Sequence, residues 1–304
     1  MLKLSGLLGL CLAMATSDFM SAADGEYTIR SNVSEVRVMF TAADAQGRRI
    51  TQLWPQDVAV VDNDQIIRRF RSFGPVSETP LDVVILVDTS GSVTKQIEKE
   101  LALVEAFVHR ANWRNGDQVS ILSFGGPKNS VICKGMCQHQ SISLSNIAIG
   151  GLTPLYDAVI EALDLASEMR TENSRAAIVV ISDGVDTYSN HSLQTAISAA
   201  QQAEARVYAI NSHADSGDDR GESTLLRMTE ETGGVTFAEG RGTAEALSAI
   251  LDDLRQGFLL TYESPHSMSV RHEIRVVPVM NPKLRFRSRK GYMELERANL
   301  AKVR

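Results

Sequence analysis

Apolar residues follow two different patterns along the chain. Between about residues 80 and 256, short runs of consecutive apolar residues alternate with longer stretches in which apolar residues recur every three or four positions. The first run, at 83–87, is uninterrupted, which is typical of a strand buried on both faces of a sheet. The amphipathic stretch at 94–113 predicts a helix with one apolar face.

The same alternation continues to residue 256 and predicts a fold class. Further strands are predicted at 119–124, 177–181, 207–210 and 235–238, and further helices at 155–167, 193–205, 223–232 and 244–256. Strands that alternate with helices favour a mostly parallel sheet covered by helices on both faces. The sequence therefore predicts a doubly wound, Rossmann-like α/β domain over residues 80–256.

The flanking segments show strand patterns without helices. Strands are predicted at 26–43, 58–61 and 66–73 before this domain, and at 258–263, 273–279 and 284–289 after it. Each flank is small, and unpaired strand edges are a liability. We expect 24–79 and 257–293 to join into one small β-sandwich-like domain, followed by a tail at 294–304; two independent flaps would give the same pattern.

The first 23 residues predict an export signal. Lys3 precedes an apolar run at 7–15, and small residues at 21–23 suit cleavage near Ala23. A lipoprotein anchored through Cys11 is the alternative, but Leu10 is bulky where a small residue is expected. Since no later segment approaches ~20 uninterrupted apolar residues, we expect a secreted or periplasmic protein with no transmembrane segment after cleavage.

Cleavage at this position leaves two cysteines, Cys133 and Cys137. An even pair in an exported chain predicts a disulfide that closes a tight loop. Their spacing could also serve a metal, but no nearby cysteine or paired histidine completes a set of four ligands.

Charge is spread unevenly along the 304 residues. The net charge of −6 gives the whole chain no electrostatic reason to bind nucleic acid. Residues 271–304 nevertheless hold ten Lys or Arg against three Asp or Glu, a net of +7. Arg285, Arg287 and Arg289 fall on one side of a predicted strand, so this segment is either a basic patch for an anionic surface or a set of solvated charges.

Oxygen-bearing side chains follow two of the predicted buried strands. Asp88, Ser90 and Ser92 come after the first, Asp183 follows the strand at 177–181, and Thr153 opens a helix between them. Ligands of open parallel sheets bind beyond the carboxyl ends of the strands. Two carboxylates and three hydroxyls suit a hard cation such as Mg²⁺ or Mn²⁺. Because the hydroxyls are neutral, the charge of the ion would be only just balanced, and an octahedral ion would keep a position that an anionic oxygen from outside could take. The leading hypothesis is that an Asp or Glu of a protein partner supplies this oxygen.

This set, Asp88-x-Ser90-x-Ser92 with Thr153 and Asp183, resembles the metal-ion-dependent adhesion site of von Willebrand factor type A domains, as in integrin I domains. The resemblance covers about residues 80–256. It implies that the two serines contact the metal directly, the threonine directly or through water, and the aspartates mostly through water. The segments 54–58 and 289–292 are also similar to a bacterial subfamily of exported von Willebrand A-related proteins described from acidobacteria, which implies no settled activity.

Other interpretations of these residues remain. Ser, Thr and Asp also favour helix starts, and Asp186 is either a cap or a support for the metal ligands. The sequence shows no Gly-x-Ser-x-Gly elbow, no histidine placed as a base and no Walker-type loop, so we expect no enzyme. The alternatives to a binding module are a structural, envelope-assembly protein whose metal only stabilises the fold and, third, a metal-dependent hydrolase.

Overall fold

The structure is a computed structural model, and it describes residues 35–76, 79–91, 97–125, 129–143, 147–171, 173–212, 219–238, 242–265 and 271–293. The predicted export signal, the tail at 294–304 and Ser92 lie outside these residues.

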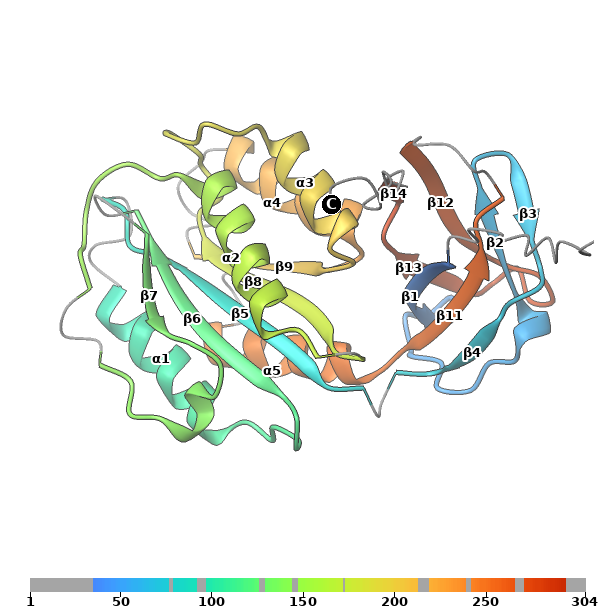
Figure 1. The fold of residues 1–304 in the computed structure, drawn as a ribbon, viewed down its shortest axis with the longest axis horizontal. Helices are drawn as coiled ribbons and strands as arrows, with labels where there is room; N and C mark the ends of the chain where they lie inside the picture. The colour runs from blue at the N-terminus through green and yellow to red at the C-terminus, as the bar shows by residue number, and fades with distance from the viewer. Residues whose placement is uncertain are drawn as a thin grey trace, which may run out of the picture. The chain divides into compact units, whose positions relative to one another are not determined.

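A mixed sheet lies between the helices α1–α5 (Figure 1). Within the described residues its strand order is β10-β9-β8-β5-β6-β7, and all neighbours are parallel except β6 and β7. Every residue of β5 and β8 is buried, as the uninterrupted apolar runs predict. The strands are β5 (Leu81–Asp88), β6 (Gln118–Phe124), β7 (Ser130–Cys133), β8 (Arg175–Ser182), β9 (Arg206–Asn211) and β10 (Thr236–Phe237).

Helices cover both faces of this sheet. On one face, α2, α3 and α4 pack with Val84 and Leu86 of β5; on the other, α1 and α5 pack with Val83 and Ile85. Successive residues of one strand therefore serve two cores, and the predicted doubly wound α/β fold is confirmed. None of the described helices has the length and apolar character needed to cross a membrane. The helices are α1 (Ile97–Arg110), α2 (Leu155–Met169), α3 (Leu193–Gln202), α4 (Asp219–Thr232) and α5 (Thr243–Arg255).

Strands from the two flanks of the sequence pair with each other in two small antiparallel sheets. One has the order β13-β1-β11-β4 and the other β14-β12-β2-β3. Their inner faces share one apolar core that includes Val38, Phe40 and Leu260. The strands are β1 (Glu35–Ala43), β2 (Val58–Asp62), β3 (Gln65–Ile67), β4 (Ser72–Pro75), β11 (Phe258–Glu263), β12 (Arg271–Pro278), β13 (Arg285–Ser288) and β14 (Gly291–Met293), and a 3-10 helix, η1 (Pro55–Asp57), precedes β2. The exact domain boundaries stay a prediction.

The segment after β6 contains a strand that the apolar pattern does not predict. β7 pairs antiparallel with the end of β6, with a register shift between Ile121 and Leu122. A disulfide joins Cys133 of β7 to Cys137 of the 3-10 helix η2 (Cys137–His139), with their Cα atoms 5.8 Å apart. A short edge strand is difficult to predict because it buries little apolar surface of its own.

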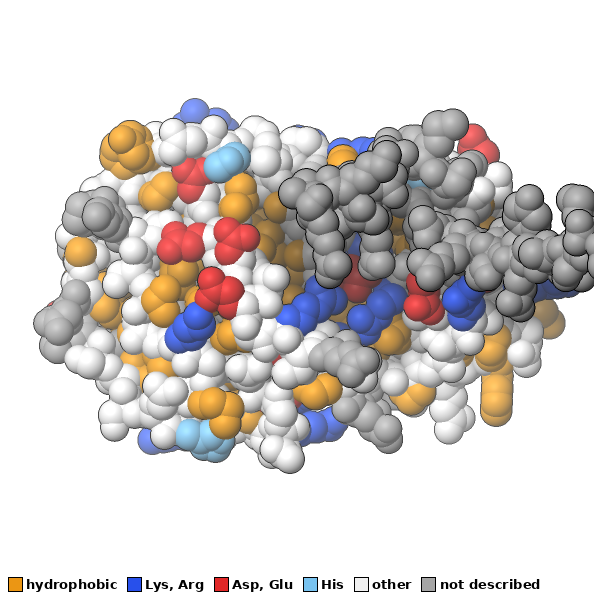
Figure 2. All heavy atoms as spheres, viewed as in Figure 1, with side chains coloured by type: hydrophobic (Ala, Val, Ile, Leu, Met, Phe, Trp, Pro, Cys, Tyr) orange, Lys and Arg blue, Asp and Glu red, His pale blue; other side chains and the backbone are white. Residues whose placement is uncertain are grey.

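Both interpretations of the C-terminal arginines are wrong for Arg287 and Arg289. Arg287 donates two hydrogen bonds of 2.8 Å to Asp253 of α5, and Arg289, which is only 8% exposed, donates to the backbone oxygens of Gln201 and Arg37. These guanidinium groups are therefore bound to carboxylate and backbone oxygens of the protein itself, while Arg285 is exposed. Figure 2 shows Lys and Arg side chains gathered with a few acidic ones near the middle of the face in view.

Candidate metal centre

Asp88 ends β5, and its side chain is held within the protein. The residue is 1% exposed. Its Oδ1 accepts a hydrogen bond of 2.9 Å from the backbone N–H of Ser90, and its Oδ2 accepts one of 2.6 Å from the hydroxyl of Ser182, the last residue of β8. The parallel pairing of β5 with β8 brings these two strand ends together. The carboxylate is thereby fixed at the carboxyl edge of the sheet.

The electrostatic surroundings of Asp88 favour a cation. Burial raises the pKa of this carboxyl, hydrogen bonds from Ser182 and Ser90 offset part of the rise, and the neighbouring Asp183 carboxylate adds to it. Among the described residues, no Lys, Arg or His forms an ion pair with either aspartate. A positive ion placed beside both would offset the desolvation and the repulsion together.

The loop that holds Ser90 is hydrogen-bonded to its neighbours on both sides. The N–H and the hydroxyl of Thr89 both donate to the carbonyl of Phe124 at the end of β6, at 2.7 and 2.9 Å. Gly150 N–H donates to the Thr89 carbonyl at 2.7 Å, and Gly91 N–H donates to the Gly151 carbonyl at 3.4 Å. These bonds join the Ser90 loop to the loop that leads into α2 and carries Thr153.

Gly125 allows this loop to lie close to β6. Its φ is +109°, a conformation that favours glycine, and a Cβ added there would lie 2.4 Å from the backbone nitrogen of Ser90. No side chain fits at this position without displacing the loop that carries the predicted ligand.

Gly125→Ala is expected to lower the free energy of unfolding by about 2 kcal/mol or more, because it adds both backbone strain and a clash with Ser90. Urea unfolding measures the loss. The matched control is Gly47→Ala, since Gly47 also has a positive φ, +77°, but has nothing within 4 Å of an added Cβ. Equal losses in the two variants would show that the close approach to Ser90 has no energetic weight.

Thr153 and Asp183 lie on the two remaining loops of this edge. Thr153 N–H donates to the Thr187 hydroxyl at 2.7 Å, and Thr187 N–H donates to the Thr153 carbonyl at 2.9 Å. Asp183 Oδ1 accepts a hydrogen bond of 2.9 Å from Val185 N–H. The loop after β8 is thus joined to the start of α2.

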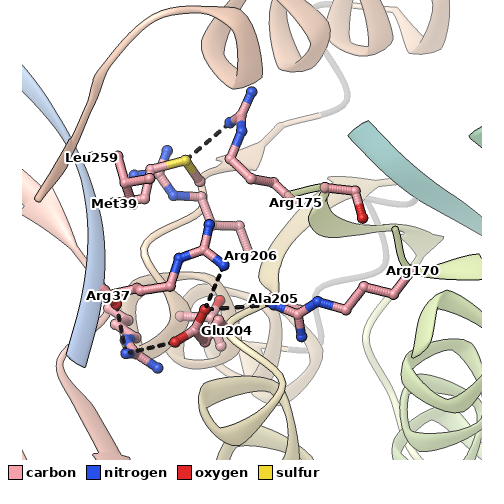
Figure 3. A pocket seen from close by; sticks show the side chains of 11 residues that line it. Arg37, Met39, Arg170, Arg175, Glu204, Ala205, Arg206 and Leu259 are labelled. Carbon is pink, nitrogen blue, oxygen red and sulfur yellow. Dashed lines mark hydrogen bonds and ion pairs between the residues drawn. The ribbon is translucent and has the colours of Figure 1, made fainter. Parts of the chain in front are cut away.

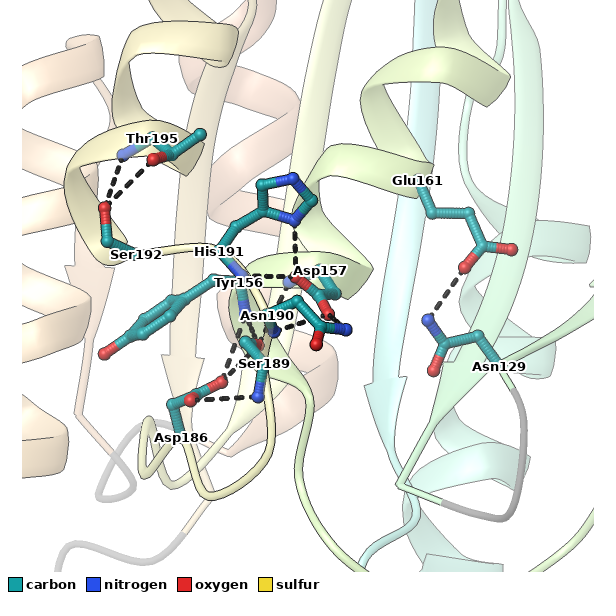
Figure 4. A network of polar contacts seen from close by, with 10 residues as sticks. All are labelled: Asn129, Tyr156, Asp157, Glu161, Asp186, Ser189, Asn190, His191, Ser192 and Thr195. Carbon is teal, nitrogen blue, oxygen red and sulfur yellow. Dashed lines mark hydrogen bonds and ion pairs between the residues drawn. The ribbon is translucent and has the colours of Figure 1, made fainter.

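Asp186 caps a helix and a turn (Figure 4). Its Oδ1 accepts from the Ser189 hydroxyl at 2.5 Å and from Tyr156 N–H, in the first turn of α2, at 3.4 Å. The Ser189 hydroxyl in turn accepts from Tyr156 N–H at 3.0 Å, and Asp157 accepts from the N–H groups of Asn190 and His191. These hydrogen bonds agree with Asp186 acting as a cap, and its role as a support for metal ligands stays a prediction.

The structure places four of the five predicted ligands at one edge of the sheet. Asp88, Ser90, Thr153 and Asp183 lie on three loops that are hydrogen-bonded to one another, while Ser92 lies outside the described residues. The described part of the chain contains no cluster of three or more His, Cys, Asp or Glu side chains suited to a metal. The predicted ligand set contains only two carboxylates, and its other three ligands are hydroxyls, so it is not a cluster of that kind. A metal at this edge of the sheet stays a prediction.

Exposed apolar side chains on the same loops were not predicted. Ile149, Leu152 and Tyr188 are 44%, 53% and 65% exposed; the first two flank Gly150 and Gly151, and the third follows Thr187. Exposed apolar residues grouped on neighbouring loops are typical of an interaction surface. Their signal in the sequence is an apolar residue inside a loop that holds Gly, Pro or Asp.

Comparison with known proteins finds a family match within the central domain. The family model for the von Willebrand factor type A domain matches residues 83–185. No curated protein matches the chain.

Several solved structures are similar to the chain. An aerotolerance-related membrane protein from Bacteroides fragilis is 20% identical, with 57% of this chain and 98% of that one covered and a TM-score of 0.44. A manganese-loaded TRAP protein from Plasmodium vivax is 14% identical, with coverages of 71% and 96% and a TM-score of 0.42. Proximal thread matrix protein 1 from the mussel byssus, with a zinc-occupied MIDAS motif, is 14% identical and has a TM-score of 0.44. The match covers 64% of this chain and 50% of that one. At these identities and TM-scores the likenesses carry no weight for function.

Proposed function

We propose that the von Willebrand factor type A domain of this chain is a metal-dependent binding module that captures a carboxylate of a protein partner. Domains of this family are usually binding modules without catalytic activity, and they are often adhesion or protein-binding modules. The observation that carries the proposal is the position of Asp88. Its buried carboxylate is near enough to Asp183 for the two to repel each other, at a sheet edge where three hydrogen-bonded loops meet.

The donor set fits a hard divalent cation, Mg²⁺ or Mn²⁺. Carboxylate and hydroxyl oxygens are the ligands such ions prefer. In this proposal Ser90, Ser92 and Thr153 offer neutral oxygens, and Asp88 and Asp183 supply the negative charge. The bound ion supplies positive charge and a coordination position that a carboxylate oxygen from outside can take.

The surroundings of the proposed ion would select the partner. Ile149, Leu152 and Tyr188 give the neighbouring loops an exposed apolar surface, and aromatic residues are frequent anchors at interfaces. We therefore expect a protein segment with an Asp or Glu next to apolar residues. Because the chain begins with a predicted signal, we propose that the partner is met outside the cytoplasm, in the periplasm or the medium.

Asp88→Asn is expected to weaken Mg²⁺ binding by about 10–100-fold, because the change removes one of the two charges that the site would offer the ion. Asparagine keeps the size of the side chain and an acceptor for Ser90, so the sheet edge is expected to stay folded. Isothermal titration with Mg²⁺ measures the affinity, and circular dichroism checks the fold.

The control for this variant is Asp164→Asn, since Asp164 is an exposed acid on α2. If Asp88→Asn and Asp183→Asn both bound Mg²⁺ as tightly as the unchanged chain, the proposed site would be wrong. Capture of a partner from the native envelope fraction should be reversed by a chelator and lost in Asp88→Asn. Metal-dependent melting without any chelator-sensitive partner would instead support the structural alternative.

A further inference from the structure

A small cavity lined by arginines lies at the opposite edge of the central sheet from the candidate metal centre. Arg175 begins β8 and Arg206 begins β9, whereas the predicted metal ligands follow the other ends of β5 and β8. Arg37 of β1, Arg170 after α2 and Arg289 after β13 complete the set of arginines (Figure 3). The cavity has a volume of about 30 Å³.

One carboxylate, that of Glu204, lines the same cavity. It lies 3.9 Å from Arg37, 3.5 Å from Arg170 and 3.8 Å from Arg289, so three guanidinium groups share it (Figure 3). Glu204 also has a φ of +54°, a left-handed conformation that is unfavourable for a residue with a side chain. The strained backbone of Glu204 thus carries a carboxylate whose single negative charge only partly neutralises the arginines that line the cavity.

Arg206 is buried, and its terminal nitrogens donate no hydrogen bond. It is 3% exposed, and neither Nη1 nor Nη2 has a hydrogen-bond partner. Its ion pair with Asp253 is long, 3.9 Å, and Asp253 already binds Arg287 at 2.8 Å and Arg49 at 3.1 Å. Buried charges are normally paired and hydrogen-bonded, so Arg206 is a donor that needs an acceptor.

Arg175 adds a second poorly compensated charge. It is 6% exposed and donates to the neutral carbonyls of Leu254 and Val76. Burial lowers the pKa of Arg175 to about 9, and repulsion from Arg206 contributes to this fall. An anion in the cavity would relieve this repulsion and would give the terminal nitrogens of Arg206 an acceptor.

We propose that this cavity binds a small tetrahedral oxyanion of the phosphate class. The guanidinium fork matches two oxygens of such an ion at once. A volume of about 30 Å³ corresponds to roughly two water molecules, which suits a free inorganic ion and is too small for a nucleotide. Five arginines against Glu204 leave an excess of positive charge that a divalent anion complements.

Both parts of the described chain would be tied together by this ion. Arg37, Met39 and Leu259 come from the antiparallel sheet that contains β1, whereas Arg170, Arg175 and Arg206 come from the α/β domain. An anion that contacts both groups of residues stabilises the folded chain as a ligand does, and the stabilisation grows with the logarithm of its concentration once that concentration exceeds its Kd.

The test uses the full chain with inorganic phosphate as the probe, in the presence of EDTA and at constant ionic strength set with NaCl. Saturable binding by isothermal titration and a rise in melting temperature with phosphate are expected. Arg206→Met should weaken phosphate binding by about 10–100-fold, the worth of one or two charge-assisted hydrogen bonds. Because Arg206 donates no hydrogen bond through its terminal nitrogens, this variant is expected to fold, and circular dichroism checks that it does.

Two further variants make the result specific. Arg206→Lys keeps the charge and loses the fork, so it should bind phosphate more weakly than the unchanged chain but more tightly than Arg206→Met. Arg68→Met removes an exposed arginine outside the cavity and should change nothing. The proposal is overturned if phosphate gives no saturable binding, or if Arg206→Met binds it as Arg68→Met does. Asp88→Asn should keep the phosphate response, so this proposal and the metal proposal fail independently.

Discussion

Asp253→Ala is expected to lower the free energy of unfolding by about 3–5 kcal/mol, because the change leaves the buried Arg206 and the partly buried Arg287 without their carboxylate. Asp253 lies on α5 and is 4% exposed. Its two oxygens accept hydrogen bonds of 2.8 Å from Arg287 and one of 2.7 Å from the Tyr208 hydroxyl, and Arg49 lies 3.1 Å away. One carboxylate thus joins α5 and β9 to residues of both flanks.

Urea unfolding measures this loss, and the neighbouring residue offers a matched control. Asp252 is exposed and precedes Asp253 on the same helix, so Asp252→Ala is expected to change stability by about 0.5 kcal/mol or less. If both variants unfolded at the same urea concentration, the carboxylate of Asp253 would make no net contribution to the free energy of unfolding.

The same residue should make stability depend on pH in acid. Burial alone would raise the pKa of Asp253, but Arg287 and Arg206 more than offset this, and the pKa falls below its usual value of 3.8. The stabilisation is therefore complete above that value and is lost as the pH falls through the lowered pKa. Asp253→Asn should remove this part of the loss of stability below pH ~4. The measurement is the urea midpoint of the unchanged chain and of the variant, from neutral pH down to acid pH.

The central sheet and most of the candidate site follow from local sequence patterns. The uninterrupted apolar run of β5 predicts a buried strand, and a residue that follows such a strand must lie at the carboxyl edge of the sheet. Asp88 and Asp183 can be placed at one edge for this reason alone. The hydroxyl of Ser182, which binds Asp88, could have been suspected from its position as the residue next to Asp183.

The buried polar contacts could not be predicted, since each depends on a partner far away in the sequence. Arg289 meets Gln201, and Arg206 meets Asp253, across many intervening residues. A run of alternating arginines on a strand indicates only that the side chains point the same way. Such side chains can point into water or toward the carbonyls at the end of a helix. The outcome depends on how the flank packs, and the periodicity of the sequence does not reveal that packing.

A second buried carboxylate, Asp62 of β2, holds the two antiparallel sheets together. The residue is fully buried. Its Oδ2 accepts hydrogen bonds from the hydroxyls of Tyr262 at 2.7 Å and Tyr292 at 2.8 Å, and its Oδ1 lies 2.6 Å from Nδ1 of His272. Tyr262 belongs to one sheet and the other three residues to the second. Burial raises the pKa of both tyrosines and Asp62 raises it further, so they remain donors at neutral pH.

Asp62→Ala is expected to lower the free energy of unfolding by about 3 kcal/mol or more, because three buried groups lose their acceptor at once and each unmet donor costs about 1–3 kcal/mol. Asp62→Asn should cost less, since its one remaining side-chain oxygen still accepts. Asp64→Ala, an exposed change two residues along the same hairpin, should leave the urea midpoint within error. An Asp62→Ala chain as stable as Asp64→Ala would mean that apolar packing around Phe40 and Leu260 alone holds the sheets together. The network would then supply specificity of pairing between the flanks without supplying stability.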